Sequence, residues 1–294
     1  FGLLNQDCLW VLDEVQLMDV GLATAAQLQA FRAQDELAGR SIRPCRSWWM
    51  SATLQRNWVE YSPDTRVLAP VPEVRVPLED RTGPLWDADK VAKPIVVTTA
   101  SDPRDIARLA LADHVGGGCG ANGPTVVVVN RVETAVKVFD VLDADLRRAG
   151  GRTELRLVHS RYRPADRAGW RDAFLKRDAC GPGTDRIIVA TQVIEAGVDI
   201  SAAVLLTEIA PWPSLVQRIG RCARWGGVGK VVVIDSAPKD SKAAAPYDKA
   251  SIDAARDALS ELADVAPRYL EAFEEAHPER LRALYPYSPP QLLA

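Results

Sequence analysis

Late in the chain runs the stretch QRIGRCAR, from Gln217 to Arg224, which follows the helix-opening residues Pro211–Ser214. It places a glutamine and three arginines within eight residues. If one helix continues through the stretch, Gln217, Arg221 and Arg224 lie on neighbouring faces. Guanidinium groups neutralise charge on a transferring phosphoryl group, and an arginine supplied in this way can raise the rate about 10³-fold or more. The stretch therefore predicts a site that faces the γ-phosphate of a nucleotide, although a solvated basic helix face would use the same residues.

A pair of carboxylates stands near the start of the chain. The apolar run Cys8–Leu12 has the composition of a buried parallel strand, and Asp13 and Glu14 follow it directly. Ligands bind at the carboxyl ends of strands in open α/β sheets. We therefore expect Asp13 to hold Mg²⁺ beside a nucleotide and Glu14 to orient the attacking water. Taken alone, a strand that ends in Asp-Glu is equally typical of an ordinary solvated strand end.

The order and spacing of four segments resemble a known superfamily. Asp13-Glu14-Val15-Gln16 is similar to the second motif of superfamily 2 helicases, and Gln217–Arg224 is similar to the sixth. Ser51-Ala52-Thr53 resembles the third motif, and Thr191–Ser201 resembles the fifth. The resemblance implies two RecA-like lobes that bind ATP and nucleic acid.

The same resemblance assigns roles to individual residues at the matching positions. The residues expected to contact the nucleotide are Asp13, Glu14, Gln16, Gly197, Asp199 and Arg218. Those expected to contact nucleic acid are Thr191, Asn130, Arg131, His159 and Ser160. The hydroxyls of Ser51 and Thr53 are expected to couple the two sites. Many relatives carry His or Asp where this chain has Gln16, and glutamine can supply a polar contact at that place.

Over residues 1–240 the chain resembles the helicase-nuclease of type I CRISPR systems. The segments that carry this resemblance are Leu12–Met18, Met50–Leu54, Thr191–Ser201 and Gln217–Arg224. The family implies ATP-driven translocation on single-stranded DNA, with ATP and Mg²⁺ as cofactors. It also implies recruitment to an RNA-guided surveillance complex and delivery of the strand to a metal-dependent histidine-aspartate nuclease. The expected role is the degradation of target DNA in antiviral defence.

One part of such a motor is missing from the sequence. No segment has the form G-x-x-x-x-G-K-[ST], whose backbone amides hold nucleotide phosphates. Gly229-Lys230 lacks the earlier glycine, and Gly116–Gly120 has no lysine and is expected to be a flexible connector. None of the three histidines is followed by aspartate. We therefore expect the chain to belong to a longer protein whose phosphate loop and nuclease lie outside it, and to be inactive by itself.

The first 93 residues predict part of one lobe and a linker. Residues 1–60 are expected to be the C-terminal part of the first RecA-like lobe, with a helix between a strand that precedes Asp13 and a strand that ends at Ser51. Residues 61–93 are rich in proline and charge, which predicts an extended linker with an edge strand at Val74–Leu78.

The rest of the chain predicts a complete α/β lobe and a helical tail. Residues 94–240 alternate apolar strand patterns with helical patterns, which indicates a second RecA-like lobe around a mostly parallel sheet. One of its helices is expected to run from Pro164 through Trp170 and Phe174. Residues 241–294 are expected to form an accessory region with one helix from about Ser251 to Glu275.

Charge and cysteine usage narrow the class of protein. A formal net charge of -3 argues against nonspecific coating of duplex DNA but allows a local groove along a single strand. Arg161, Arg163, Arg167 and Arg171 form a basic cluster that is either a nucleic-acid contact or a solvated helix face. Five cysteines without a C-x-x-C pair predict reduced thiols in the cytoplasm, and no apolar stretch is long enough to span a membrane.

Two other functions fit the same residues. A general DEAD/DEAH-type RNA helicase or remodeller would prefer RNA and have no surveillance-complex partner. A nucleic-acid-binding module without catalysis would be consistent with the absent phosphate loop. Translocation polarity and oligomeric state stay open.

Overall fold

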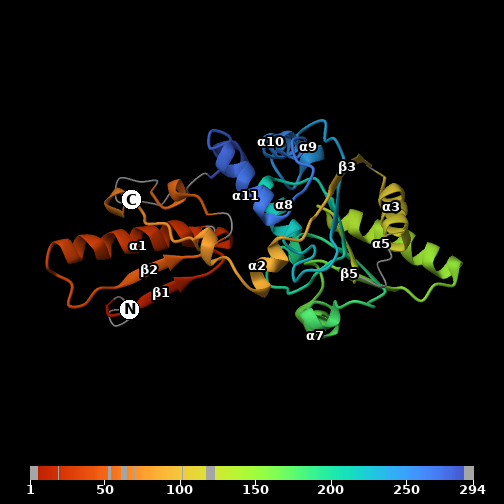
Figure 1. The fold of residues 1–294 in the computed structure, drawn as a ribbon, viewed down its shortest axis with the longest axis horizontal. Helices are drawn as coiled ribbons and strands as arrows, with labels where there is room; N and C mark the ends of the chain where they lie inside the picture. Colours follow the sequence, from red (N-terminus) through yellow and green to blue (C-terminus); the bar gives the residue numbers. More distant parts are fainter. Residues whose placement is uncertain are drawn as a thin grey trace. The chain divides into compact units, whose positions relative to one another are not determined.

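The computed structural model describes residues 6–18, 20–51, 54–60, 65–68, 70–100, 102–116 and 123–287. The chain divides into two compact units, of which the first is Phe1–Pro77 with Tyr285–Ala294 and the second is Leu78–Leu284 (Figure 1). The division falls inside the segment that we expected to be a linker. Thr53 and residues 117–120 of the glycine-rich connector lie outside the described residues.

The first unit is built from two parallel strands and a long helix. Strand β1 (Leu9–Leu12) pairs with β2 (Arg46–Trp49), and α1 (Val20–Leu37) connects them. The 3₁₀ turns of this unit are Val15–Leu17, Arg56–Trp58 and Thr65–Leu68. Trp58 stacks on Tyr287 with a centroid distance of 5.1 Å, which explains why the C-terminal residues join this unit.

Two predictions for the first 93 residues were wrong. Strand β1 forms and is parallel, but it is not buried, because Leu9 is 50% exposed and Val11 is 54% exposed. The expected edge strand at Val74–Leu78 does not form. The chain there has no regular structure before the 3₁₀ turn Leu78–Asp80, since the prolines of this segment have no N–H to donate to a strand ladder.

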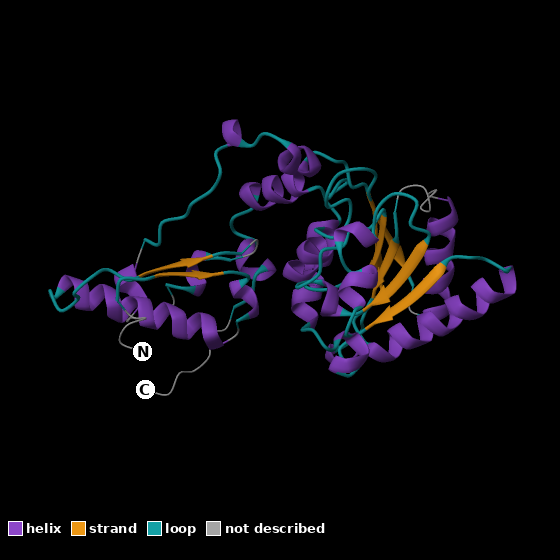
Figure 2. Cartoon of the chain, turned by 90° about the horizontal axis from the view of Figure 1, so that it is seen from below, coloured by secondary structure: helices purple, strands orange, loops and turns teal. Residues whose placement is uncertain are grey.

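The second unit is organised by a sheet of six parallel strands (Figure 2). Their order in the sheet is β3 (Ile95–Thr99), β8 (Lys230–Asp235), β7 (Val204–Glu208), β4 (Thr125–Val128), β6 (Arg186–Ala190) and β5 (Glu154–Val158). Every neighbouring pair is parallel, as the apolar runs predicted. All six strands therefore present their carboxyl ends at one edge of the sheet, which is where ligands bind in this class of fold.

Helices lie on both sides of this sheet (Figure 2). One core cluster joins α3 (Pro103–Gly116) and α5 (Val132–Ala149) to one face of the sheet. It includes Ile106, Ala110, Val138 and Leu142 from the helices, and these residues are buried at helical spacing. The central strand β4 is fully buried along its length.

The remaining helices are shorter than α1, α3 and α5. They are α2 (Pro84–Asp89), α6 (Pro164–Arg167), α7 (Trp170–Phe174), α8 (Trp212–Ile219), α9 (Ser241–Ala244), α10 (Lys249–Leu259), α11 (Pro267–Ala276) and α12 (Leu281–Leu284), with 3₁₀ turns at Arg177–Ala179 and Gln192–Ile194. None of the helices in the described ranges combines the length and the apolar character of a transmembrane span.

Two of these helices correct predictions. The expected helix from Pro164 to Phe174 is broken at Gly169, whose φ of 86° is not helical. The expected helix from Ser251 to Glu275 is two helices, because Pro267 begins a new one and cannot donate a hydrogen bond to the preceding turn. Helices α9 to α12 belong to the same compact unit as the six-stranded sheet.

We expect Leu142→Ala to lower the free energy of unfolding by about 2–5 kcal/mol, because its side chain is fully buried between α5 and the sheet. Urea denaturation measures this loss. Val136→Ala is the matched control, since Val136 lies on the same helix but is 36% exposed, and we expect it to change stability by less than about 1 kcal/mol. Equal losses in the two variants would contradict the packing of α5.

Candidate functional site

The carboxylates of the first unit lie on the turn that follows β1. Glu14 adopts φ 51° and ψ 46°, a left-handed conformation that is uncommon for residues other than glycine. Its amide N–H donates to Asp13 Oδ1 at 2.9 Å, and its Oε2 accepts from Gln16 Nε2 at 2.5 Å. Asp13 itself is exposed at the strand end. The turn therefore presents carboxylate oxygens, the ligands that Mg²⁺ prefers, at the place where the sequence predicted them.

The backbone ties this turn to the segment that precedes Ser51. The N–H of Met50 donates to the carbonyl of Leu12 at 2.8 Å, and the N–H of Val15 donates to the carbonyl of Met50 at 3.2 Å. Ser51, the next residue, is half-buried. The turn that carries Asp13 and Glu14 is thus hydrogen-bonded on both sides to Met50, the residue directly before Ser51.

In the second unit, three neighbouring strands bring the other candidate segments together. Strands β7, β4 and β6 are adjacent in the sheet. Asn130 lies just beyond β4, Thr191 directly follows β6, and Glu208 ends β7. The N–H of Asn130 donates to Glu208 Oε2 at 2.7 Å, and its carbonyl accepts from Gln192 Nε2 at 2.9 Å. These contacts fix the loops after the three strands in one arrangement.

Arg218 lies at the centre of this arrangement and is fully buried. Its guanidinium forms an ion pair with Glu195 at 2.8 Å. It also donates to Asn130 Oδ1 at 3.0 Å, Thr207 Oγ1 at 3.1 Å and the Tyr247 hydroxyl at 2.9 Å. We had expected Arg218 to contact the nucleotide. In this structure its donors are directed inward, so it joins the fifth-motif and sixth-motif segments instead.

The two later arginines are placed by a loop and not by a helix. The expected helix through Gln217–Arg224 ends at Ile219, with Gln217 half-buried in its last turn. Arg221 is buried and donates to the backbone carbonyls of Ile194, at 3.1 Å, and Glu195. Because these acceptors lie in the fifth-motif segment, Arg221 is held against that segment by the loop that follows α8.

Arg224 is the more accessible of the two. Its guanidinium lies 3.3 Å from Asp199 Oδ1, and its side chain is 39% exposed. Its backbone N–H donates to Ser201 Oγ at 2.8 Å. Gly197, with φ 73°, allows the turn that brings Asp199 to this position. The structure thus brings together Gly197, Asp199, Arg221 and Arg224, although not on the helix faces that we predicted.

Most of the expected nucleic-acid contacts have inward-facing side chains. Thr191, Asn130 and His159 are buried, and Asn130 Nδ2 donates to the carbonyl of Ile209 at 2.7 Å. The exposed Arg131 donates to the carbonyls of residues 242, 243 and 245, and so it holds the segment around α9. Ser160 is exposed. A nucleic-acid strand could therefore reach only a few of these residues without a rearrangement of the fold.

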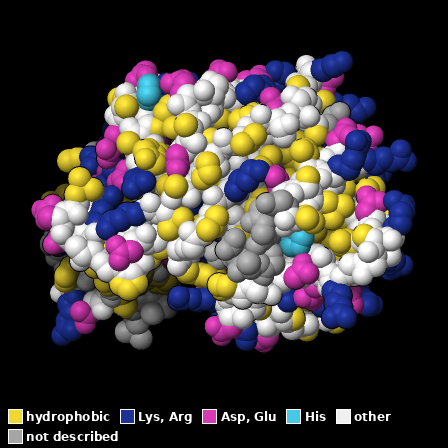
Figure 3. Space-filling view, turned by 45° about the vertical axis from the view of Figure 1, so that its right-hand side comes forward, with side chains coloured by type: hydrophobic (Ala, Val, Ile, Leu, Met, Phe, Trp, Pro, Cys, Tyr) yellow, Lys and Arg dark blue, Asp and Glu magenta, His cyan; other side chains and the backbone are white. Residues whose placement is uncertain are grey.

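The basic cluster after β5 is only partly free for a ligand. Arg161 pairs with Glu133 at 2.6 Å, and Arg163 pairs with Asp166 at 2.9 Å. Arg167 and Arg171 are exposed. On the face drawn in Figure 3, Lys and Arg side chains stand among Asp and Glu side chains and do not form one block. Positive charge that could attract a polyanion is therefore confined to small areas of this face.

The sequence did not indicate two residues that complete the site. Glu195 balances the charge of Arg218, and Tyr247 ties Arg218 to the segment between α9 and α10. Glu195 lies inside the quoted fifth-motif segment, so its position was a usable signal. Tyr247 is far from Arg218 in sequence and carries no local signal. Among the described residues there is no cluster of three or more His, Cys, Asp or Glu side chains that could hold a metal ion by themselves.

The parallel six-stranded α/β sheet has the fold of the RecA-like lobes in solved Cas3 structures. Residues 121–226 match the family described as CRISPR-associated nuclease/helicase Cas3, C-terminal. The chain is therefore similar to the CRISPR-associated superfamily 2 helicases.

Individual relatives agree with this family. The CRISPR-associated helicase Cas3 of Thermoproteus tenax is 31% identical over 142 residues, which are 48% of this chain and 22% of the relative. The CRISPR-associated nuclease/helicase Cas3 of Haloferax volcanii is 33% identical over 140 residues, which are 42% of this chain and 14% of the relative. The chain thus spans less than a quarter of the length of these relatives.

Solved structures agree with the fold. The crystal structure of T. fusca Cas3 with ATP has a TM-score of 0.66 and 18% sequence identity, and the match covers 93% of this chain and 38% of that one. A chain of a CRISPR RNA-guided surveillance complex in a pre-nicking state matches with a TM-score of 0.62 and 17% identity, over 93% of this chain and 40% of that one.

We expect Arg218→Ala to lower the free energy of unfolding by about 3–5 kcal/mol, because it leaves the Glu195 carboxylate without its ion pair in the protein interior. Urea denaturation at pH 7 tests this. Arg147→Ala is the matched control, since the Arg147 side chain is 79% exposed, and we expect a change within about 0.5 kcal/mol. A loss for Arg218→Ala no larger than that of the control would show that its guanidinium is not buried.

We expect the stability of the protein to depend on the charge of His159. Burial lowers the pKa of His159, and the positive charge of Arg161 lowers it further. The folded state therefore favours the neutral ring, and this stabilisation is complete above about pH 6.5 and is lost as the pH falls below it. His159→Phe keeps a ring against Tyr162, 4.3 Å from the histidine ring, but does not titrate. Denaturation gives the free energy of unfolding of both proteins at pH 7.5 and at pH 5.5. Between these two pH values the wild-type protein should lose more stability than His159→Phe. Equal losses would contradict the prediction.

Proposed function

We propose that this chain forms part of an ATP-dependent, CRISPR-associated superfamily 2 helicase that translocates on single-stranded DNA and unwinds target DNA for degradation. The observation that carries the proposal is the placement of Arg221 and Arg224 against the segment from Ile194 to Asp199 at the strand ends. That arrangement couples the fifth-motif loop to the cations that would neutralise a γ-phosphate. An Arg-rich helix with a solvated face would make no such contacts.

The residues of the first unit fit a nucleotide and its metal. Asp13 would hold Mg²⁺, and Glu14 would orient the attacking water. Gln16, whose amide donates to Glu14, would hold that carboxylate in place. When bound, ATP with Mg²⁺ supplies the phosphoryl group whose release drives the motor. Ser51 and Thr53 would pass the change to the strand-binding surface.

The residues of the second unit would supply positive charge to the same reaction. Gln217, Arg221 and Arg224 would close on the γ-phosphate, with Gly197 and Asp199 beside them. Thr191, Arg131 and Ser160 would meet the nucleic-acid backbone at the same edge of the sheet, and Asn130 and His159 would set the shape of their loops. Arg218 would act as the buried link between the two groups.

The proposed partners follow from the relatives. The helicase is proposed to translocate on single-stranded DNA and to be recruited by an RNA-guided surveillance complex. A nuclease outside these residues is proposed to cleave the strand. The chain by itself is proposed to hydrolyse no ATP, because its sequence has no G-x-x-x-x-G-K-[ST] loop. Residues 1–60 and 94–240 are proposed to be the parts of two RecA-like lobes, joined by 61–93 and followed by a helical region, 241–294.

The test uses the gene product that contains this chain, assayed for ATP hydrolysis with single-stranded DNA and with single-stranded RNA. We expect Arg224→Ala to reduce DNA-stimulated turnover about 10²-fold or more, while DNA binding changes less than about threefold, because the arginine acts on the phosphoryl group and not on the strand. Asp13→Ala should have the same effect, and the chain alone should show no turnover.

Arg147→Ala is the matched control, since it removes an exposed arginine on α5 and should leave turnover unchanged. RNA-selective stimulation would favour a general RNA helicase or remodeller. A gene product that binds DNA but hydrolyses no ATP would favour the binding module. Unchanged turnover in Arg224→Ala would refute the role of this arginine.

A further inference from the structure

Strand β5 is the last strand of the six-stranded sheet, and within the described residues it pairs only with β6. The direction of its backbone groups follows from two hydrogen bonds. The N–H of Glu154 donates to the carbonyl of Asp185, and the carbonyl of Val158 accepts from Thr191, so alternate residues from Glu154 to Val158 face β6. The N–H and C=O groups of Leu155 and Leu157 therefore face outward. A free strand edge of this kind is a template for another extended chain.

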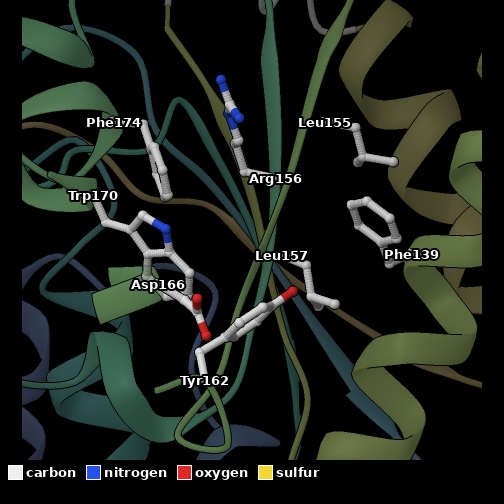
Figure 4. A pocket seen from close by; sticks show the side chains of 8 residues that line it. All are labelled: Phe139, Leu155, Arg156, Leu157, Tyr162, Asp166, Trp170 and Phe174. Atoms are coloured by element: carbon white, nitrogen blue, oxygen red, sulfur yellow. The ribbon is translucent and has the colours of Figure 1, made fainter. Parts of the chain in front are cut away.

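A hollow of about 260 Å³ lies along this free edge (Figure 4). It is lined by Phe139, Leu155, Arg156, Leu157, Tyr162, Asp166, Trp170 and Phe174. Figure 4 shows Leu155 and Phe139 on one side of the strand, and Phe174 and Trp170 on the other. Because side chains alternate between the faces of a strand, a chain that paired with β5 would place successive side chains toward these two sides in turn.

The aromatic side of the hollow is held in place by its own contacts. Tyr162 meets Trp170 edge-on with a centroid distance of 4.9 Å, and Trp170 lies 5.9 Å from Phe174. The guanidinium of Arg156 lies over the ring of Phe174 at 5.4 Å. A ligand side chain that enters here therefore meets rings that are already ordered, which lowers the entropy cost of binding.

The charge beside the hollow favours acidic residues in the occupant. Arg156 and Arg163 have carboxylate partners, Glu154 and Asp166. Arg167 and Arg171 are exposed, and neither forms an ion pair with a described residue. These two residues flank Trp170 in the sequence, and their guanidinium groups would attract carboxylates near the ends of a bound segment.

We propose that the free edge of β5 binds an extended segment of a partner protein, which adds a seventh strand to the sheet. The segment carries apolar side chains at the alternate positions that face the aromatic side of the hollow, and acidic residues at its ends. A nucleic-acid strand fits this place less well, because its backbone has no N–H groups to pair with the carbonyls of Leu155 and Leu157. The inference does not depend on the proposed motor function.

The opposite edge of the sheet offers a matched comparison. On β3 the N–H of Ile95 faces outward and already donates to the carbonyl of Ala263 at 3.2 Å. By the same alternation, the N–H of Val97 faces outward. No residue of β3 lines the hollow beside β5. If any free edge sufficed, both edges would bind a peptide equally.

The probe is a ten-residue acetylated peptide that alternates valine or phenylalanine with threonine and carries two glutamates at each end. We expect it to slow hydrogen exchange at the amides of Leu155 and Leu157 about tenfold or more, and to leave Val97 unaffected. A second peptide, with proline at the positions that pair with β5, should lose at least about tenfold in affinity, because it lacks the pairing N–H groups. A third peptide with lysine for glutamate should also bind more weakly.

Three protein variants complete the test. Trp170→Ala should weaken binding of the probe about tenfold, because it removes an aromatic wall of the hollow. Leu157→Pro should weaken binding of the probe, and Val97→Pro should leave it unchanged. Circular dichroism checks that each variant is folded. Equal binding of the probe and its proline form by unaltered protein overturns the proposal. It is also overturned if oligothymidylate, and not the peptide, protects Leu155 and Leu157, since that result makes the edge a nucleic-acid surface.

Discussion

The second unit depends on one buried cation. Arg218 is fully removed from water, and a buried guanidinium is tolerated only when its charge and its N–H groups are matched. Glu195 supplies the charge, and Asn130, Thr207, Glu208 and Tyr247 accept the remaining donors. These partners come from the end of β7, from the loops after β4 and β6, and from the segment before α10. The hydrogen bonds of Arg218 therefore hold these parts of the second unit together.

The same constraint explains why the C-terminal helices pack with the sheet. Tyr247 reaches Arg218 from the segment between α9 and α10, and Arg131 holds the carbonyls beside α9. Lys93, also a buried cation, donates to the carbonyl of Ile219 at the end of α8, and burial lowers its pKa. The loop that carries Arg221 and Arg224 thus begins at a helix end that is fixed from two directions.

Much of the fold could be predicted from the sequence, because runs such as Ile187–Ala190 are apolar on both faces, as parallel strands require. The errors came from tertiary context. Strand β1 has the composition of a buried strand, but within the described residues it pairs only with β2, and Leu9 and Val11 stay exposed. The helix after Pro211 ends at Ile219, and in the loop that follows Arg221 donates to the Ile194 carbonyl and Arg224 pairs with Asp199, contacts that no helical periodicity predicts. The inward direction of Arg218 depends on Tyr247, which no local pattern reveals.

The three arginines of the sixth-motif segment differ in exposure in a way that separates their possible roles. Arg218 and Arg221 are buried, so turning either toward a ligand would break bonds within the fold. Arg224 is 39% exposed, and its partner Asp199 is 50% exposed. An ion pair at that exposure is worth about 0–1 kcal/mol, so exchanging a carboxylate for a phosphate oxygen costs the fold little. Any conformational change that depends on a nucleotide should therefore begin at the Arg224–Asp199 pair. Arg221 would move next, because it contacts the same fifth-motif segment, and Arg218 would keep its position.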